Sequence, residues 1–98
     1  MNLDLLDIIG AIRPPEALAI QSLASRRARP DALFVEVGVW KGHSASLIGE
    51  VVKSKGGHLY CIDHWRGSEE TEMIQEVARH DIYEIFEHNM RELDLWDC

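Results

Sequence analysis

Residues 34–44, FVEVGVWKGHS, place a carboxylate, two glycines and a serine at a spacing that suits the binding of a small ligand. Glu36 stands in an otherwise apolar run, where a carboxylate is costly unless it is paired or hydrogen-bonded. Gly38 permits backbone torsions that a side chain forbids, and Gly42 lets the main chain approach a ligand closely. Ser44 offers a hydroxyl at the start of a helix, whose first N–H groups and positive dipole end attract an anion.

A second acid, Asp63, ends the next apolar run, HLYCID, and supplies the other half of the pattern. An acid at this place can accept hydrogen bonds from both hydroxyls of a ribose. Each acid also has a plain structural interpretation: Glu36 can form a salt bridge to a nearby lysine or arginine, and Asp63 can be an N-cap or loop acid. The combination of the two favours a ligand site.

The elements that position these residues alternate between strand and helix. ALFVEV (residues 32–37) is apolar with a single charge, which predicts a strand that is covered on both faces and therefore parallel. Residues 43–57 carry an apolar stripe at helical spacing and end at two glycines, and residues 58–63 form the second strand. Strand, helix and strand predict a right-handed βαβ unit and an α/β, Rossmann-like fold class.

Two helices are expected before this unit. Residues 2–12 have apolar side chains at helical spacing, and residues 13–28 suit a helix that opens at Pro15. We therefore interpret the chain as a single partial domain, with N-terminal helices over residues 1–30 and a βαβα portion over residues 31–98.

After the second strand the sequence predicts a loop, HWRGSEET, and two helices over residues 69–78 and 81–95. Asp81 can cap the second of these, with Glu84 completing a capping box. In an alternating pattern a third strand comes next, and two parallel strands do not form an independently covered sheet. We expect either the front part of a larger domain or a chain whose missing sheet partner belongs to another molecule.

Composition excludes several classes of protein. The chain has 98 residues, of which 46% are hydrophobic and 28% charged, as in a soluble globular domain. A formal net charge of −7 argues against a nucleic-acid partner. No run has the length of a membrane span and the N-terminus lacks the basic region of a signal peptide, so a cytoplasmic location is the default. Neither the two cysteines nor the five histidines show a disulfide or metal-ligand spacing, and we expect no metal site.

VEVGVWKGHS resembles the first motif of class I S-adenosylmethionine-dependent methyltransferases, in the form of the catechol O-methyltransferase-like branch of small-molecule O-methyltransferases. LYCIDHWRGSEE and the helix after it resemble the second motif, so the resemblance extends from Leu33 to Leu95. It implies S-adenosylmethionine as cofactor and methyl transfer to a small-molecule acceptor, with a hydroxyl as the expected methyl-accepting group. In that branch the groups that activate the acceptor, sometimes carboxylates around a divalent metal, follow a third strand. Hence no catalytic residue can be named, and this chain alone is expected to be inactive.

The resemblance also implies roles for the residues around the first strand. Gly38 and Gly42 would face the methionine moiety of the cofactor with bare backbone. Glu36 would anchor the loop near the amino group of the cofactor, and Ser44 would meet its carboxylate at the helix N-terminus.

Further roles follow for the rest of the turn and for the second strand. Asp63 would hold the ribose hydroxyls, with His64 and Trp65 beside the adenine. Trp40 occupies the aromatic position of the family and would cover the cofactor, or it is simply a packed loop aromatic. Lys41 belongs to the same cofactor-binding turn but departs from the G-x-G-x-G spelling of many relatives.

Two other classes compete with this interpretation. Nicotinamide dehydrogenases share the fold, but their G-x-G-x-x-G fingerprint is absent, because Gly38 is followed by Val39 and Trp40. The other alternative is a truncated, non-catalytic interaction module that pairs with another chain, or with a second copy of itself, through an exposed apolar strand edge.

Overall fold

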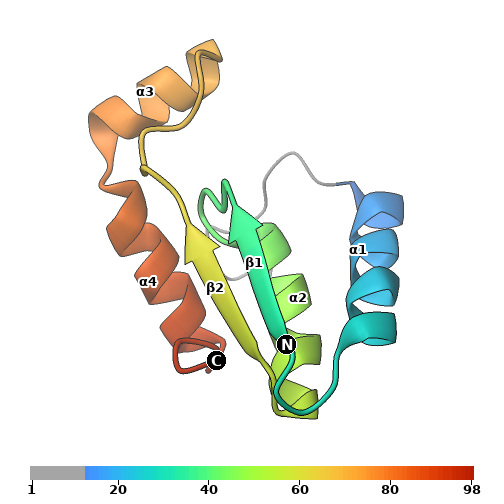
Figure 1. The fold of residues 1–98 in the computed structure, drawn as a ribbon. Helices are drawn as coiled ribbons and strands as arrows, with labels where there is room; N and C mark the ends of the chain where they lie inside the picture. Colours follow the sequence, from blue (N-terminus) through green and yellow to red (C-terminus); the bar gives the residue numbers. More distant parts are fainter. Residues whose placement is uncertain (1–12) are drawn as a thin grey trace.

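A computed structural model describes residues 13–98, which form four helices and a two-stranded parallel sheet (Figure 1). The order of these elements confirms the expected βαβ unit, with a helix before it and two helices after it. The helix expected over residues 2–12 lies outside the described residues. The elements are α1 (Pro14–Arg27), β1 (Leu33–Val37), α2 (His43–Lys55), β2 (His58–Ile62), α3 (Thr71–Arg79) and α4 (Ile82–Glu92).

The register of the sheet brings the carboxyl ends of both strands together. Leu33 pairs with His58, and the ladder runs to the pair of Val37 and Ile62. One more hydrogen bond extends it, because the Gly38 N–H donates to the Ile62 carbonyl at 2.8 Å. The residues that follow the two strands therefore leave the sheet side by side, and α3 lies beyond the same edge (Figure 1).

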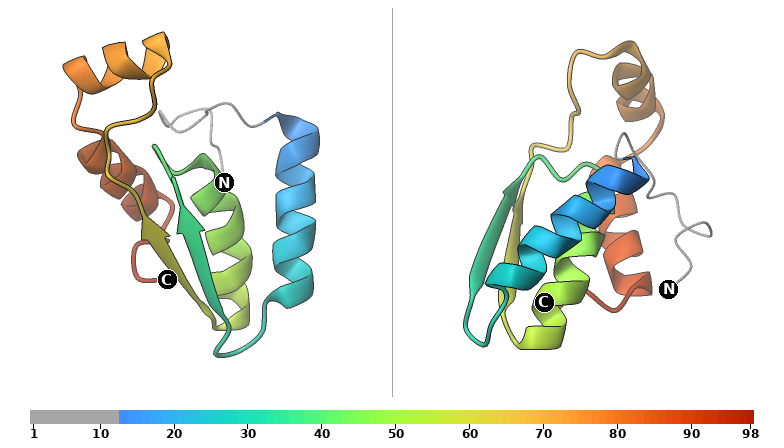
Figure 2. Two further views of the ribbon diagram at one scale, coloured as in Figure 1. Left: turned by 45° about the horizontal axis from the view of Figure 1, so that its top comes forward. Right: turned by 90° about the vertical axis from the view of Figure 1, so that its right-hand side faces the viewer.

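The two faces of the sheet differ completely. Figure 2 shows α1, α2 and α4 on one side of the sheet, and none of the elements in residues 13–98 covers the other side. The expectation that the first strand is covered on both faces is therefore wrong for the described part of the chain. Alternate side chains of both strands form this open face: Leu33, Val35, Val37, Tyr60 and Ile62, with exposed fractions between 55% and 76%.

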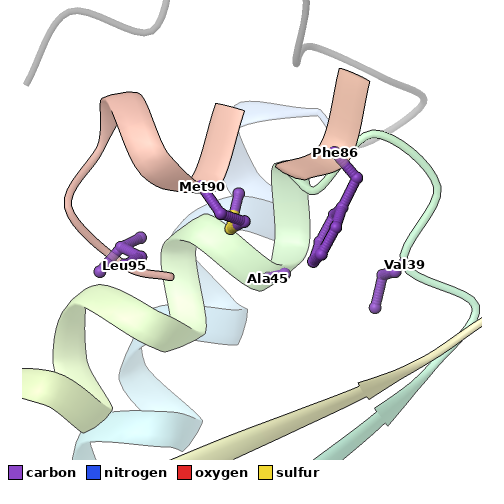
Figure 3. Close-up of a cluster of buried hydrophobic side chains, with 5 residues drawn as sticks. All are labelled: Val39, Ala45, Phe86, Met90 and Leu95. Carbon is purple, nitrogen blue, oxygen red and sulfur yellow. The ribbon is translucent and has the colours of Figure 1, made fainter. Parts of the chain in front are cut away.

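The hydrophobic core lies between α2, α4 and the covered side of the sheet. Figure 3 shows its centre, where Phe86 and Met90 of α4 lie over Ala45 of α2. Val39, from the turn after β1, and Leu95, which follows α4, complete the buried cluster. These contacts hold α4 and the β1–α2 turn against each other, which is the framework on which the strand tips rest.

Local signals set the ends of the helices. Asp81 caps α4 by accepting a hydrogen bond from the Glu84 N–H at 3.2 Å, as the sequence predicted. Gly56 ends α2 in the left-handed conformation, at φ 82°. The first helix begins at Pro14, one residue earlier than predicted, with proline at its first turn. Within residues 13–98, no helix combines the length and the apolar character needed to cross a membrane.

Candidate functional site

The carboxylate of Asp63 connects the two strand tips. Its Oδ2 accepts a hydrogen bond from the Trp40 N–H at 2.9 Å, and its Oδ1 accepts one from the Trp65 N–H at 2.9 Å. Both tryptophans have left-handed backbones, with φ 52° for Trp40 and φ 65° for Trp65. That conformation is unfavourable for a bulky residue and persists only where the surroundings enforce it. Asp63 thus fixes the turn after β1 and the turn after β2 relative to each other.

The same contacts keep Asp63 ionised. Desolvation raises the pKa of its carboxyl group, but hydrogen bonds from the N–H groups of Trp40, Trp65 and Val39, together with His64, lower the pKa below its ordinary value. The two carboxylate oxygens offer four lone pairs, and the three N–H donors use three of them. The strand tip therefore presents a fixed negative charge that can accept one further hydrogen bond.

Glu36 lies in the opposite electrostatic situation. Its side chain points to the helix side of the sheet, where the Ser44 hydroxyl donates a hydrogen bond to Oε1. Oε2 is buried, and no group in residues 13–98 donates a hydrogen bond to it. Burial raises the pKa of Glu36, and the hydrogen bond from Ser44 opposes that rise. The salt bridge to lysine or arginine considered as an alternative is not formed among the described residues, so the site contains a buried acceptor in need of a donor.

His43, the first residue of α2, is a site residue that sequence reasoning did not assign to the ligand. Its Nδ1 is also buried without a hydrogen-bond partner among the described residues. It is next to Ser44, and the Gly42 that precedes it has no side chain to cap the helix. Unsatisfied polar atoms are rare in buried positions. Two such atoms, Glu36 Oε2 and His43 Nδ1, belong to residues near the start of α2. The start of α2 therefore has polar groups that a ligand could hydrogen-bond.

The two glycines of the turn serve different purposes. Gly38 has φ 82°, and a Cβ built on it would meet nothing within 4 Å, so its backbone is open to approach. Gly42 has φ 99°, but its Cβ would lie 2.6 Å from Met90 Cε and 3.1 Å from Phe86 Cδ1. Packing alone therefore accounts for glycine at this position, and a role of the Gly42 backbone toward the cofactor stays a prediction. Its missing side chain makes room for the core residues of α4 that Figure 3 shows.

Lys41 contacts two helices of the same chain. Its side chain is only 7% exposed and forms an ion pair with Glu76 of α3. Its carbonyl accepts a hydrogen bond from Asn89 Nδ2 of α4 at 3.0 Å, and Asn89 is buried. Lys41 thus braces the turn against two helices at once. Sequence reasoning missed this role because both partners are distant along the chain and leave no local signal.

The remaining aromatic residues of the site pack against neighbouring elements. The Trp40 ring lies on Gly67, where a Cβ would come within 3.0 Å of its Cζ3. The Trp65 ring packs against Tyr83 and Phe86 of α4, with centroid distances of 5.2 Å and 5.0 Å. These contacts favour the packed interpretation of Trp40 and give Trp65 a place in the core, while a role of Trp65 beside an adenine stays a prediction.

His64 lies at the surface of the second strand tip. It is exposed, and its Nδ1 accepts a hydrogen bond from the Arg66 N–H at 3.0 Å. The same nitrogen lies 3.7 Å from Asp63 Oδ1. In residues 13–98 no three His, Cys, Asp or Glu side chains gather into a group that could hold a metal ion.

The arrangement of the two strands, their turns and the helix between them defines a class of fold. A parallel βαβ unit with a glycine turn and a helix start at one strand tip, and an acid at the other, is a partial Rossmann-like fold with its binding edge at the carboxyl ends of the strands. A family model described as "Methyltransferase domain" matches residues 35–94. That range begins within β1, ends just after α4 and includes both strand tips. The chain belongs to this family of methyltransferase domains.

Proposed function

We propose that the chain binds S-adenosylmethionine at the two strand tips and is the cofactor-binding portion of a class I methyltransferase. One observation carries the proposal: two carboxylates with opposite pKa shifts, Glu36 and Asp63, lie at the ends of neighbouring strands, where the backbone of Gly38 is open to approach. Ionisable groups with such perturbed environments are concentrated at functional sites. The family match supplies independent support for a methyltransferase.

The polar groups of the site suit the functional groups of this cofactor. The ammonium of S-adenosylmethionine would supply the donor that the buried Oε2 of Glu36 lacks. The first turn of α2 would receive the carboxylate, because helix N-termini attract anions. Asp63 retains a lone pair for a ribose hydroxyl, and the open backbone at Gly38 leaves room for close approach.

When bound, S-adenosylmethionine supplies a methyl group activated by its sulfonium for in-line displacement. The residues of this chain would bind and orient it, since Asp63 and Lys41 fix the turn that holds it. We propose a small molecule with a hydroxyl group as the methyl acceptor, on the resemblance to small-molecule O-methyltransferases. The acceptor-activating groups of that branch follow a third strand, so residues 1–98 are expected to bind the cofactor without transferring its methyl group. The cytoplasmic location likewise stays a prediction.

Calorimetric titration of the 98-residue chain tests this function. We expect one molecule of S-adenosylmethionine to bind per chain and NAD to show no binding heat. Asp63→Asn should weaken binding about 10-fold or more, because removing a hydrogen-bonding charge costs about 1.5–3 kcal/mol. Asp97→Asn, at an exposed acid near the C-terminus, is the matched control and should leave binding unchanged. Binding of NAD, or of neither ligand, would contradict the proposal.

The open face favours a second candidate function, association with a second copy of this chain. It carries five large apolar or aromatic side chains and His58, and no Asp, Glu, Lys or Arg of β1 or β2 lies on it. Patches of that kind mark interaction surfaces. At their exposures these side chains offer roughly 500–600 Å² per copy, so a face-to-face pair would bury roughly 1,000–1,200 Å², the lower limit of specific interfaces.

Light scattering coupled to size exclusion decides whether the open face associates. We expect Val37→Lys to shift a dimer toward monomer, because it places a charge on the open face. Val37 is 76% exposed, more than the other large side chains of that face. Leu18→Lys changes a side chain on α1 that is 68% exposed, and should leave the dimer intact. A monomeric wild-type chain at all concentrations would exclude this second function.

A further inference from the structure

A cavity of about 250 Å³ lies on the covered side of the sheet, apart from the strand-tip site. It opens between β2, α2, α4 and the segment after α4. Neither Glu36, Gly38 nor Asp63 lines it. The walls consist mainly of four aromatic side chains and two thiols: Trp65, Tyr83, Phe86, Trp96, Cys61 and Cys98.

The four rings surround the space in orientations that suit a further ring. Trp65 and Tyr83 meet at 74° and Tyr83 and Trp96 at 73°, with centroids 5.2 Å and 6.5 Å apart. Phe86 packs against both tryptophans, at 5.0 Å from Trp65 and 6.3 Å from Trp96. Contacts at such distances are favourable between aromatic groups, and a further ring in the cavity would extend the same cluster.

The lining is uncharged. Among residues 13–98, no Asp, Glu, Lys or Arg side chain belongs to it. Burial raises the pKa of Cys61 to about 12, with smaller contributions from Glu36 and Cys98, and burial also raises the pKa of Cys98. Both thiols are therefore neutral near pH 7 and act as weak donors rather than nucleophiles. A charged group, the Arg91 guanidinium, lies next to the lining, 4.7 Å from the centroid of the Trp96 ring. A charged ligand would lose its hydration in the cavity without a charged side chain among the lining residues, and a ligand that reacts with thiolate would find none.

We propose that this cavity binds a neutral, flat aromatic molecule of one or two fused rings. An apolar cavity of about 150 Å³ holds benzene, so 250 Å³ accommodates a ring system the size of indole. Trp65 connects the cavity to the strand tips, because its side chain lines the cavity while its backbone N–H donates to Asp63. Glu36, Gly38 and Asp63 do not line the cavity, so either proposal can fail without the other.

The three tryptophans provide a direct readout in the 98-residue chain labelled with ¹⁵N. During titration with indole, the Nε1–H signals of Trp65 and Trp96 should shift, and that of Trp40, which does not line the cavity, should stay in place. Indole-5-carboxylate has the same rings with a charge and should bind at least 10-fold more weakly. Absence of shifts at millimolar indole, or equal binding of the charged analogue, would overturn the proposal.

Two substitutions on the same strand separate the cavity from the rest of the surface. Cys61→Met places a longer side chain in the cavity and should weaken indole binding at least 10-fold. Ile62→Met changes the next residue, on the open face, and should leave binding unchanged. Equal effects of the two substitutions would overturn the assignment.

A second cavity variant keeps the test decisive if Cys61→Met does not fold. Gly49→Ala adds a methyl group to the lining at 3.5 Å from Leu95 Cδ1, an ordinary contact distance. It also replaces glycine within a helix, which favours folding. It should melt at or above the wild-type temperature and bind indole more weakly. Unchanged indole binding in a folded Gly49→Ala chain would contradict the proposal.

Discussion

Replacing Glu36 by glutamine should stabilise the fold and weaken cofactor binding at the same time. The substitution keeps the shape of the side chain and an oxygen that can accept the Ser44 hydroxyl, but it removes the charge from a partly buried position. Because burial raises the pKa of Glu36 above 4.5, the folded chain holds this proton more tightly than the unfolded chain does. The contribution of Glu36 to stability is therefore fully present below pH 4.5 and is lost as the pH rises through the folded pKa.

The size of the effect follows from the environment of the carboxylate. Glutamine still leaves one polar atom unpaired but removes the charge, and partial exposure limits the relieved desolvation cost to about 1 kcal/mol. In a domain of this length, about 1 kcal/mol corresponds to about 4–8 °C in Tm. The lost contact to the cofactor ammonium is a charged one worth about 1.5–3 kcal/mol, so affinity should fall about 10- to 100-fold.

Thermal melts at pH 7 and pH 4, with calorimetric titration at pH 7, measure both effects. We expect Glu36→Gln to melt higher than wild type at pH 7 and equally at pH 4. Glu50→Gln, at an exposed acid of α2, should change neither stability nor affinity. A Glu36→Gln chain that melts lower at pH 7, or binds S-adenosylmethionine as tightly as wild type, would refute the reasoning.

Three further outcomes follow from the site geometry. Asp63→Asn should lower the free energy of unfolding at pH 7 by about 1–3 kcal/mol. Because the pKa of Asp63 is lowered, its contribution to stability is present above pH 3.8 and is lost as the pH falls through the folded pKa. Urea titrations should therefore show a smaller difference between Asp63→Asn and wild type in acid. Gly42→Ala should lower the free energy of unfolding in urea by at least about 2 kcal/mol, because the new side chain adds backbone strain and overpacks the core. Gly38→Ala adds only backbone strain and should lower it by about 1 kcal/mol, so equal losses would contradict the different roles of the two glycines. Glu76→Gln should speed amide hydrogen exchange in α3 by loosening its contact with the β1–α2 turn, while Glu72→Gln, at an exposed acid of the same helix, should not.

The sequence was sufficient for the order of the elements and for the neighbouring strand tips. Apolar runs separated by an amphipathic segment require a βαβ unit, and parallel strands necessarily end at the same edge of a sheet. The sequence alone therefore predicts that Glu36 and Asp63 lie near each other. Helix ends at Asp81 and Gly56 were likewise readable, because caps are set by local chemistry.

Features that depend on contacts between distant segments were not readable. Lys41 gave no sign that Glu76 and Asn89 would hold it, and Gly42 gave no sign that α4 would fill the space beside it. The open face was misjudged for another reason. An apolar strand indicates that both of its faces are kept from water. It does not indicate which element covers each face, or whether that element lies within residues 13–98.

Chemical-shift mapping with S-adenosylmethionine tests the central claim most directly. In ¹⁵N-labelled chain, saturating cofactor should shift the backbone signals of Gly38, Trp40 and Ser44 at the first tip and of Asp63 at the second, and leave those of Val35 and Tyr60 on the open face unchanged. If the cofactor shifts no backbone signal, or shifts only residues away from the two strand tips, the two tips do not form its binding site.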